Sequence, residues 1–170
     1  MVWTPPTHVA ANGRSDSDKF NTETVDNLTH LHGQVATQWG QLAAIEVPDV
    51  TWVSVPWGFT VEDTGHTDVV DGYPERVAPL LPGYWWLNVR IQWPAGTGNR
   101  AVRIQKNGTG ALGQDTRSAL VTACYTSVTT LAQCNGTTDF LNVHVWQNSG
   151  ATVTIPALLP HYFQLLLPRG

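Results

Sequence analysis

The stretch Tyr84-Trp85-Trp86-Leu87-Asn88-Val89-Arg90-Ile91-Gln92-Trp93 decides the fold of this 170-residue chain. From Trp85 onward every second residue is apolar, and most of the residues between are polar. Successive side chains of a strand point to opposite faces of a sheet, so this alternation predicts a half-buried β-strand at the centre of a core. The second face is polar except for Tyr84 and Trp86, which predicts that it is buried against another subunit.

The composition is that of a folded protein with few charges: 42% of the residues are hydrophobic, 13% are charged, and eight are Trp. Trp is enriched at protein interfaces, and few charges remain to keep an isolated surface soluble. A net charge of −4 without a basic stripe argues against a nucleic-acid partner. No apolar run is long enough for membrane insertion, and the N-terminus lacks the pattern of a secretion signal, so we expect synthesis and assembly in a cytoplasm.

Residues 1–47 are predicted to form an N-terminal unit that consists of an arm and one helix. The arm, to about residue 20, contains adjacent prolines and an Asn-Gly pair, which favour an extended segment. We expect it to dock on a partner; the alternative is a flexible tail. The anchoring residues of the arm are predicted to be Trp3, Pro5, Pro6, Val9 and Phe20.

An amphipathic helix is predicted between Asn21 and Pro48. Asn21 and Thr22 suit a helix N-cap, and the apolar residues that follow recur at spacings of three and four, as in a short coiled coil. About three heptads are marginal for a coil on its own, so it would need a neighbouring domain that also oligomerises. The alternative is one helix packed on its own domain. The predicted trimer contacts of this helix are Leu28, Leu31, Val35, Leu42 and Ile45.

Residues 48–170 are predicted to form a head domain, because the apolar period changes to two beyond Pro48. Seven or eight short strands with regular turn signals and no helical stretch indicate an antiparallel β-sandwich or jelly roll. We expect an acidic loop at residues 62–75 and turns at Asn107-Gly108 and Asn135-Gly136. The expected strands span about residues 53–59, 84–93, 101–106, 118–125, 140–147, 153–155 and 162–167.

Aromatic side chains also occupy the second face of several predicted strands. Tyr84 and Trp86 have counterparts in Phe140 and Trp146 at the ends of another alternating stretch. We predict that these four residues form the intersubunit contact of the head. The alternative is that some of them lie under the acidic loop of the same subunit.

The chain carries no recognisable catalytic constellation, so we expect no enzymatic activity, no cofactor and no metal site. His30 and His32 are two residues apart on the predicted helix and cannot chelate from one face. The acidic loop could hold calcium, but a solvated loop is the simpler interpretation. Cys124 and Cys134 are interpreted as two small buried thiols, with a local bridge formed outside the cell as the alternative.

Several short motifs resemble the trimeric jelly rolls of the tumour necrosis factor and complement globular-head superfamily. They are Gly83-Tyr84-Trp85-Trp86-Leu87, Lys106-Asn107-Gly108, the stretch from Phe140 to Gly150, and the closing Tyr162-Phe163-Gln164-Leu165-Leu166-Leu167. The resemblance covers roughly residue 47 to the end. It implies a homotrimeric head.

The first forty residues resemble the start of minor tail and other virion proteins of phages that infect actinobacteria. The matching segments are the opening Trp3-Thr4-Pro5 and the run Phe20-Asn21-Thr22-Glu23-Thr24-Val25-Asp26-Asn27-Leu28. This resemblance implies a virion protein, a homotrimeric fibre or spike that docks on other virion proteins by its N-terminus and presents its head to the host.

Two functions therefore follow as expectations, and a third is the less favoured alternative. The first is a minor tail protein whose head binds a host-surface glycan or protein, through loops at about residues 94–99, 107–116 and 134–139. The second keeps the fold but makes the chain a capsid decoration or head fibre. The third, a glycan-cleaving enzyme, needs paired carboxylates that flank a cleft, whereas the acidic residues here cluster in one loop or on the helix.

Overall fold

The computed structural model describes residues 35–63, 65–157 and 161–168. Within these ranges the chain forms strands and no helix. The strands are β1 (Val35–Gln41), β2 (Ile45–Val47), β3 (Val53–Ser54), β4 (Trp57–Asp63), β5 (Thr67–Val69), β6 (Arg76–Pro79), β7 (Pro82–Trp93), β8 (Asn99–Lys106), β9 (Thr109–Ser118), β10 (Cys124–Asn135), β11 (Leu141–Gln147), β12 (Val153–Ile155) and β13 (Tyr162–Leu167).

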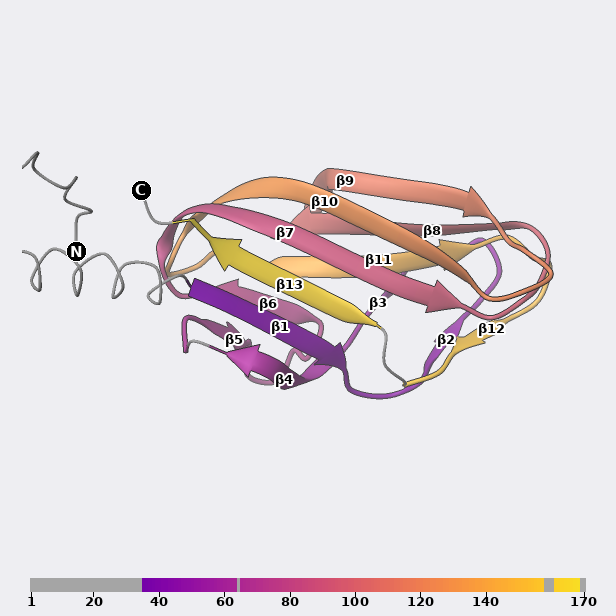
Figure 1. Ribbon diagram of the computed structural model, residues 1–170, viewed down its shortest axis with the longest axis horizontal. Coiled ribbons are helices and arrows are strands. Elements are labelled where there is room, and N and C mark those ends of the chain that lie inside the picture. The colour runs from indigo at the N-terminus through magenta and orange to yellow at the C-terminus, as the bar shows by residue number, and fades with distance from the viewer. Residues whose placement is uncertain (1–34, 64, 158–160, 169–170) are drawn as a thin grey trace, which may run out of the picture.

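The strands form a sandwich of two antiparallel sheets, with a small pairing of β2 and β12 beside them (Figure 1). One sheet has the order β10-β7-β13-β1-β4, and the other has β5-β6-β11-β8-β9 with β3 beside β11. Strand β7 lies inside the first sheet, between β10 and β13, as its alternation predicts. Its inward residues Trp85, Leu87, Val89, Ile91 and Trp93 are fully buried between the sheets.

Several predictions from the sequence are confirmed. The alternating stretches at 84–93, 101–106, 140–147, 153–155 and 162–167 are strands β7, β8, β11, β12 and β13, within a few residues at their ends. The Asn107-Gly108 turn joins β8 to β9, and both of its residues have positive φ, 54° and 67°, as a tight hairpin requires. Gly136, after β10, also has a positive φ of 74°.

The prediction that a helix extends to Ile45 is wrong, because Val35–Gln41 is strand β1 and Ile45–Val47 is strand β2. β1 pairs with β13 on one side and with β4 on the other, so these residues belong to the sandwich and the head begins before residue 48. The hydrogen bonds and burial gained from two neighbouring strands outweigh a local helical pattern that Gly40 already weakens.

Four other expectations need correction. The strand predicted at 53–59 is split at Pro56 into β3 and β4, which lie in different sheets. The loop predicted at 62–75 contains the end of β4 and all of β5. The segment 107–116 was expected to be a loop and is mostly β9, whereas 119–123, part of the strand expected at 118–125, connects β9 to β10.

The sandwich has two ends, which we call the near end and the far end. The near end holds the start of β1 and the end of β13, where Val35 is opposite Leu167, on the left in Figure 1. It also holds the turn after β8 and the loop after β10, which Asp139 joins: its carboxylate is 2.8 Å from Lys106 Nζ and accepts a 2.8 Å hydrogen bond from Asn107.

The far end holds three connections that are bonded to one another. Gly96 N donates to the carbonyl of Leu120 at 3.0 Å, and Asn99 N donates to Asn148 Oδ1 at 2.6 Å. Leu120 and Val121 protrude there with 53% and 95% of their surface exposed. The loops expected to meet a host surface together therefore do not share one end: 94–99 is at the far end, and 134–139 is at the near end.

Candidate functional site

The candidate site is the outward surface of the β10-β7-β13-β1-β4 sheet, which we call the front face. The strand registers place its side chains in cross-strand rows. An apolar row contains Leu131, Trp86, Leu166 and Ala36, and the amide row beside it contains Thr129, Asn88, Gln164 and Gln38. A third row contains Ser127, Arg90, Tyr162 and Gly40, which the ring of Phe59 covers.

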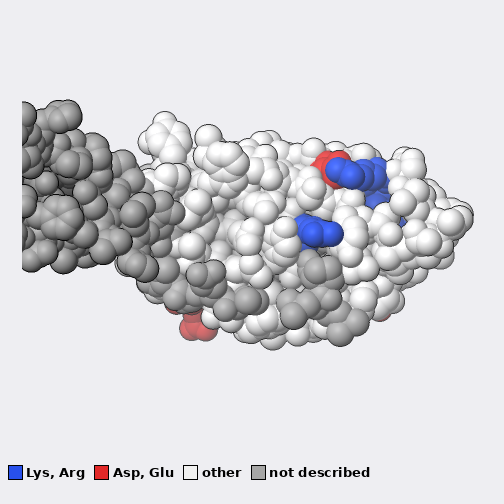
Figure 2. All heavy atoms as spheres, in the orientation of Figure 1, with Lys and Arg blue, Asp and Glu red and all other residues white. Residues whose placement is uncertain are grey.

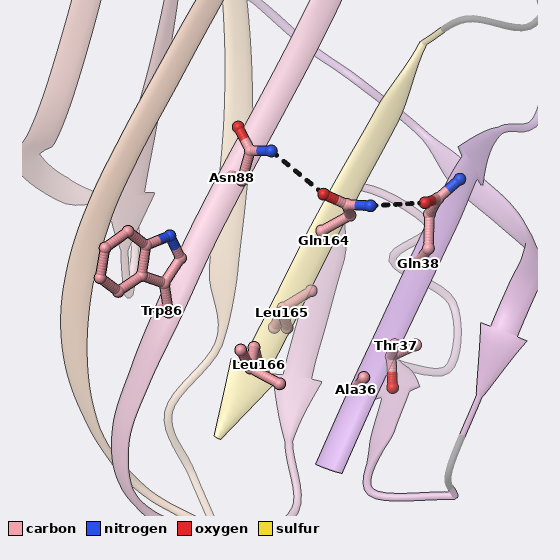
Figure 3. Close-up of a pocket in the computed structure, with 8 residues that line it drawn as sticks. All are labelled: Ala36, Thr37, Gln38, Trp86, Asn88, Gln164, Leu165 and Leu166. Atoms are coloured by element: carbon pink, nitrogen blue, oxygen red, sulfur yellow. Dashed lines mark hydrogen bonds between the residues drawn. The ribbon is translucent and has the colours of Figure 1, made fainter. Parts of the chain in front are cut away.

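Trp86 is the most prominent side chain of the apolar row. About half of its surface is exposed (49%), and its neighbour Leu131 on β10 is exposed to a similar degree (54%). Tyr84, two residues before Trp86 on the same face of β7, is 62% exposed. A hollow of about 290 Å³ lies on one side of Trp86, toward β13 and β1 (Figure 3). A second hollow, of about 380 Å³, lies on the other side, toward Leu131 and β10. The indole thus stands between two depressions.

The amide row is a continuous chain of hydrogen bonds across four strands. Thr129 Oγ1 donates to Asn88 Oδ1 at 3.3 Å, and Asn88 Nδ2 donates to Gln164 Oε1 at 3.0 Å. Gln164 Nε2 then donates to Gln38 Oε1 at 2.7 Å, and the last two bonds are drawn in Figure 3. Each amide fixes the orientation of the next, so the row has a defined direction from β10 to β1.

Charged side chains are sparse on the front face. Figure 2 shows it almost entirely free of Lys, Arg, Asp and Glu over the described residues, with the blue side chains gathered toward the far end. Arg90 lies in the third row, and its guanidinium stacks 3.9 Å from the centre of the Tyr125 ring. No carboxylate in the described part of the chain forms an ion pair with it. Contact with a partner through Arg90 would therefore separate no ion pair among the side chains that the structure describes.

The structure does not bring the four predicted head residues together. Tyr84 and Trp86 are on the front face, but Phe140 and Trp146 lie beside and on β11, in the opposite sheet. Both are half-buried by their own chain. The Trp146 ring centroid is 6.2 Å from that of Trp52, and the Arg76 guanidinium lies 4.7 Å above the Phe140 ring.

The residues predicted for the helix are also separated. Ile45 is buried in the core at 5% exposure, whereas Leu42 is 54% exposed and lies over Gly58. Val35 starts β1. The remaining predicted residues lie outside the described ranges: Leu28, Leu31 and the arm residues Trp3, Pro5, Pro6, Val9 and Phe20.

Sequence reasoning missed the amide row and the apolar partners of Trp86. Gln38 was assigned to a helix, and the register that aligns it with Gln164 and Asn88 comes from pairing between distant strands. One signal was available in the sequence. The closing strand carries an amide and an apolar residue, Gln164 and Leu166, between its inward residues, and β7 carries the same pair of types in Asn88 and Trp86.

The described residues contain no arrangement that resembles an active site or a metal site. Burial raises the pKa of Cys134 to about 11, so its thiol is protonated at neutral pH. Burial lowers the pKa of His144, and the nearby Arg103 lowers it further. Among the described residues no group of three or more His, Cys, Asp and Glu side chains could hold a metal ion. None of them belongs to a helix that is long and apolar enough to cross a membrane.

The two cysteines are free thiols at opposite ends of β10. Ten residues of extended strand separate them by about 33 Å at roughly 3.3 Å per residue, whereas the Cα atoms of a disulfide are less than about 7 Å apart. A bridge between Cys124 and Cys134 of one subunit is therefore incompatible with this fold.

Comparison with known proteins gives matches in structure only. No protein-family model and no curated protein sequence matches the chain. Crystal structures of murine APRIL at pH 5.0 and at pH 8.0 superpose with TM-scores of 0.62, at 12% and 13% identity, and cover 79% of this chain and 99% of theirs. The structure of Eiger TNF from S. frugiperda has a TM-score of 0.55 at 13% identity and covers 80% and 93%. The described part of this chain therefore has a jelly-roll fold similar to that of tumour necrosis factor ligands.

Proposed function

We propose that this chain is the subunit of a homotrimeric binding protein, and that the front face is its intersubunit contact. The observation that carries the proposal is the exposed apolar row around Trp86 on a face almost without charge. Large apolar patches on soluble proteins mark interaction sites, and interfaces are enriched in aromatic residues and depleted of charged ones. A trimer is the assembly that the resemblance to tumour necrosis factor and complement heads implies.

The chain's work in this proposal is binding and not catalysis. The Cys134 thiol is not an activated nucleophile, since burial raises its pKa to about 11 and keeps it protonated at neutral pH. The Asp139 carboxylate, which could serve as an acid or base, is engaged by Lys106 and Asn107, whose hydrogen bonds lower its pKa.

The setting we propose is a phage particle, on which the chain is a minor tail fibre or spike. Support comes from the resemblance of Trp3-Thr4-Pro5 and of residues 20–28 to phage virion proteins. The position of Val35 agrees with it, because a connection through this residue would enter the head at its near end, at the opposite end from the three far-end connections. A capsid decoration protein would use the same arrangement, and the particle would form in the host cytoplasm.

The far end is then the candidate surface for a host glycan or protein. Three connections meet there, and Leu120 and Val121 stand out from them with little cover. Loops held by a rigid sandwich are common binding elements. Leu120→Asp/Val121→Asp should abolish adsorption to host cells and keep the thermal stability of the head. Leu80→Asp, in the connection before β7, is the matched control with unchanged adsorption; equal adsorption of all three proteins would refute this assignment.

Sedimentation velocity tests the trimer. The wild-type chain should sediment with a mass of three times 18.6 kDa, and Trp86→Arg should sediment as a folded monomer. A monomeric wild-type protein at all accessible concentrations would overturn the proposal. Immunogold labelling of purified phage particles would then place the chain on the tail or on the capsid; particles without label would exclude the virion role.

A further inference from the structure

The amide row crosses a face whose other exposed side chains are largely apolar or aromatic. We infer that this row is the element that restricts the trimer to one arrangement of its subunits, by requiring hydrogen-bond acceptors from the second copy of the chain. The inference rests on the proposed trimer and adds to it which residues determine its geometry.

The need for acceptors follows from the hydrogen bonds within the row. A carboxamide has two N–H donors. Asn88 and Gln164 each use one of theirs inside the row, and Gln38 only accepts there. One N–H of Asn88, one of Gln164 and both of Gln38 therefore lie outside the row's own hydrogen bonds. In an isolated subunit water reaches these half-buried groups, whereas an interface removes that water.

The apolar row alone cannot select one arrangement. Trp86 stands between two hollows, and contacts between apolar surfaces are non-directional, so several rotations of a second copy would bury similar areas. Each arrangement that covers the amide row without providing acceptors leaves buried donors unsatisfied, which is unfavourable. Single polar residues in otherwise apolar interfaces fix register and stoichiometry in this way.

The intrachain bonds make the row suitable for this role. Because Thr129, Asn88 and Gln164 hold one another in sequence, the amides are oriented before association and lose little side-chain freedom on binding. The Gln38 carboxamide lies at the β1 end of the row, and its nitrogen points away from Gln164, in the direction in which the hydrogen bonds of the row run (Figure 3).

The test replaces the row by apolar residues of similar size, in Gln38→Leu/Asn88→Leu/Gln164→Leu. The matched control is Gln114→Leu/Thr116→Val, which removes a hydrogen-bonded polar pair, 3.2 Å long, from exposed positions of β9. In native mass spectrometry and sedimentation velocity, wild type and control should give one trimeric species. The row variant should associate at concentrations about tenfold lower and give more than one stoichiometry.

The outcomes distinguish the role of the amide row from the existence of the trimer. A row variant that forms the same single trimer overturns the inference and leaves the proposed trimer standing, whereas a monomeric wild type overturns both. If the row variant fails to fold, hydrogen exchange of the side-chain amides in the wild type decides instead. Exchange of the Gln38 and Gln164 amide protons that slows on assembly supports the inference, and unchanged exchange overturns it.

Discussion

Truncation of the exposed indole by Trp86→Ala should loosen the proposed trimer without unfolding the head. A fully accessible Trp side chain exposes on the order of 250 Å², so an exposure of 49% leaves about 120 Å² available for burial. At about 25 cal/mol per Å², burial of this area contributes about 3 kcal/mol for each subunit, or a factor of about 100 in a dissociation constant. The change removes most of this contribution.

The assay is sedimentation velocity over a concentration series, with thermal unfolding measured on the same samples. We expect the midpoint of dissociation to move to at least about 100-fold higher protein concentration, because each of the three subunits loses this contribution. The unfolding of the dissociated chain should change little, because the indole lies outside the core. Tyr73→Ala is the matched control, since Tyr73 is an aromatic residue of similar exposure (47%) that lies outside the front-face sheet. An unchanged midpoint for Trp86→Ala, or an equal shift for Tyr73→Ala, would refute the assignment of the front face.

Three further predictions concern the stability of the head. Asp139→Ala should lower the free energy of unfolding in urea by about 2 kcal/mol, because it removes the carboxylate to which Lys106 and Asn107 donate, although Lys106 keeps a 2.6 Å hydrogen bond to the Gln133 carbonyl. Glu75→Ala removes a longer ion pair of 3.6 Å between more exposed side chains and should cost less than about 1 kcal/mol. Burial lowers the pKa of His161, whose Nδ1 accepts a 3.0 Å hydrogen bond from Gln92 N. The unfolded chain therefore binds a proton at higher pH than the folded chain, and the free energy of unfolding should fall as the pH drops below about 6.5; an equal pH dependence in His161→Gln would contradict this. Gly136→Ala should lower the free energy of unfolding by about 2 kcal/mol, and with it the melting temperature, because φ is positive there and a Cβ would approach Pro82 N to 2.5 Å. The control is Gly108→Ala, where φ is also positive but no atom is near. Equal melting temperatures of the two variants would show that the close approach has no effect.

The sequence predicted the parts of the fold whose pattern is local. The alternation of Tyr84 to Trp93 and of Tyr162 to Leu167 depends only on burial of one strand face, and both strands form where expected. The Asn107-Gly108 hairpin was predictable because few residues adopt two consecutive positive φ angles.

The region 35–47 could not be predicted in the same way. Val35, Trp39 and Leu42 recur at spacings of three and four, which resemble one face of a helix. In the structure Val35 and Trp39 are positions of β1, whose neighbour β13 lies far along the chain, with Trp39 opposite Phe163. A window of local sequence does not contain that partner, and tertiary pairing overrides local propensity.

The candidate site was predictable only in part for a related reason. Alternation along β7 predicts that Tyr84 and Trp86 lie on the face opposite the core, and in the structure of the single chain both side chains are exposed on that face. It cannot say which residues of other strands stand beside them, because that depends on strand order and register. Strand order separates Trp86 from Trp146, and register aligns Asn88 with Gln164 and Gln38.

The position of β1 between β13 and β4 has a mechanical consequence for a protein tethered through residue 35. Figure 1 shows β1 running from the near end along the length of the sandwich. Tension between that tether and a ligand held at the far end would pull β1 parallel to its neighbours, so the backbone hydrogen bonds to both strands would bear the force together. Rupture would require them to shear as a group, a geometry that resists extension far better than peeling bonds apart one after another.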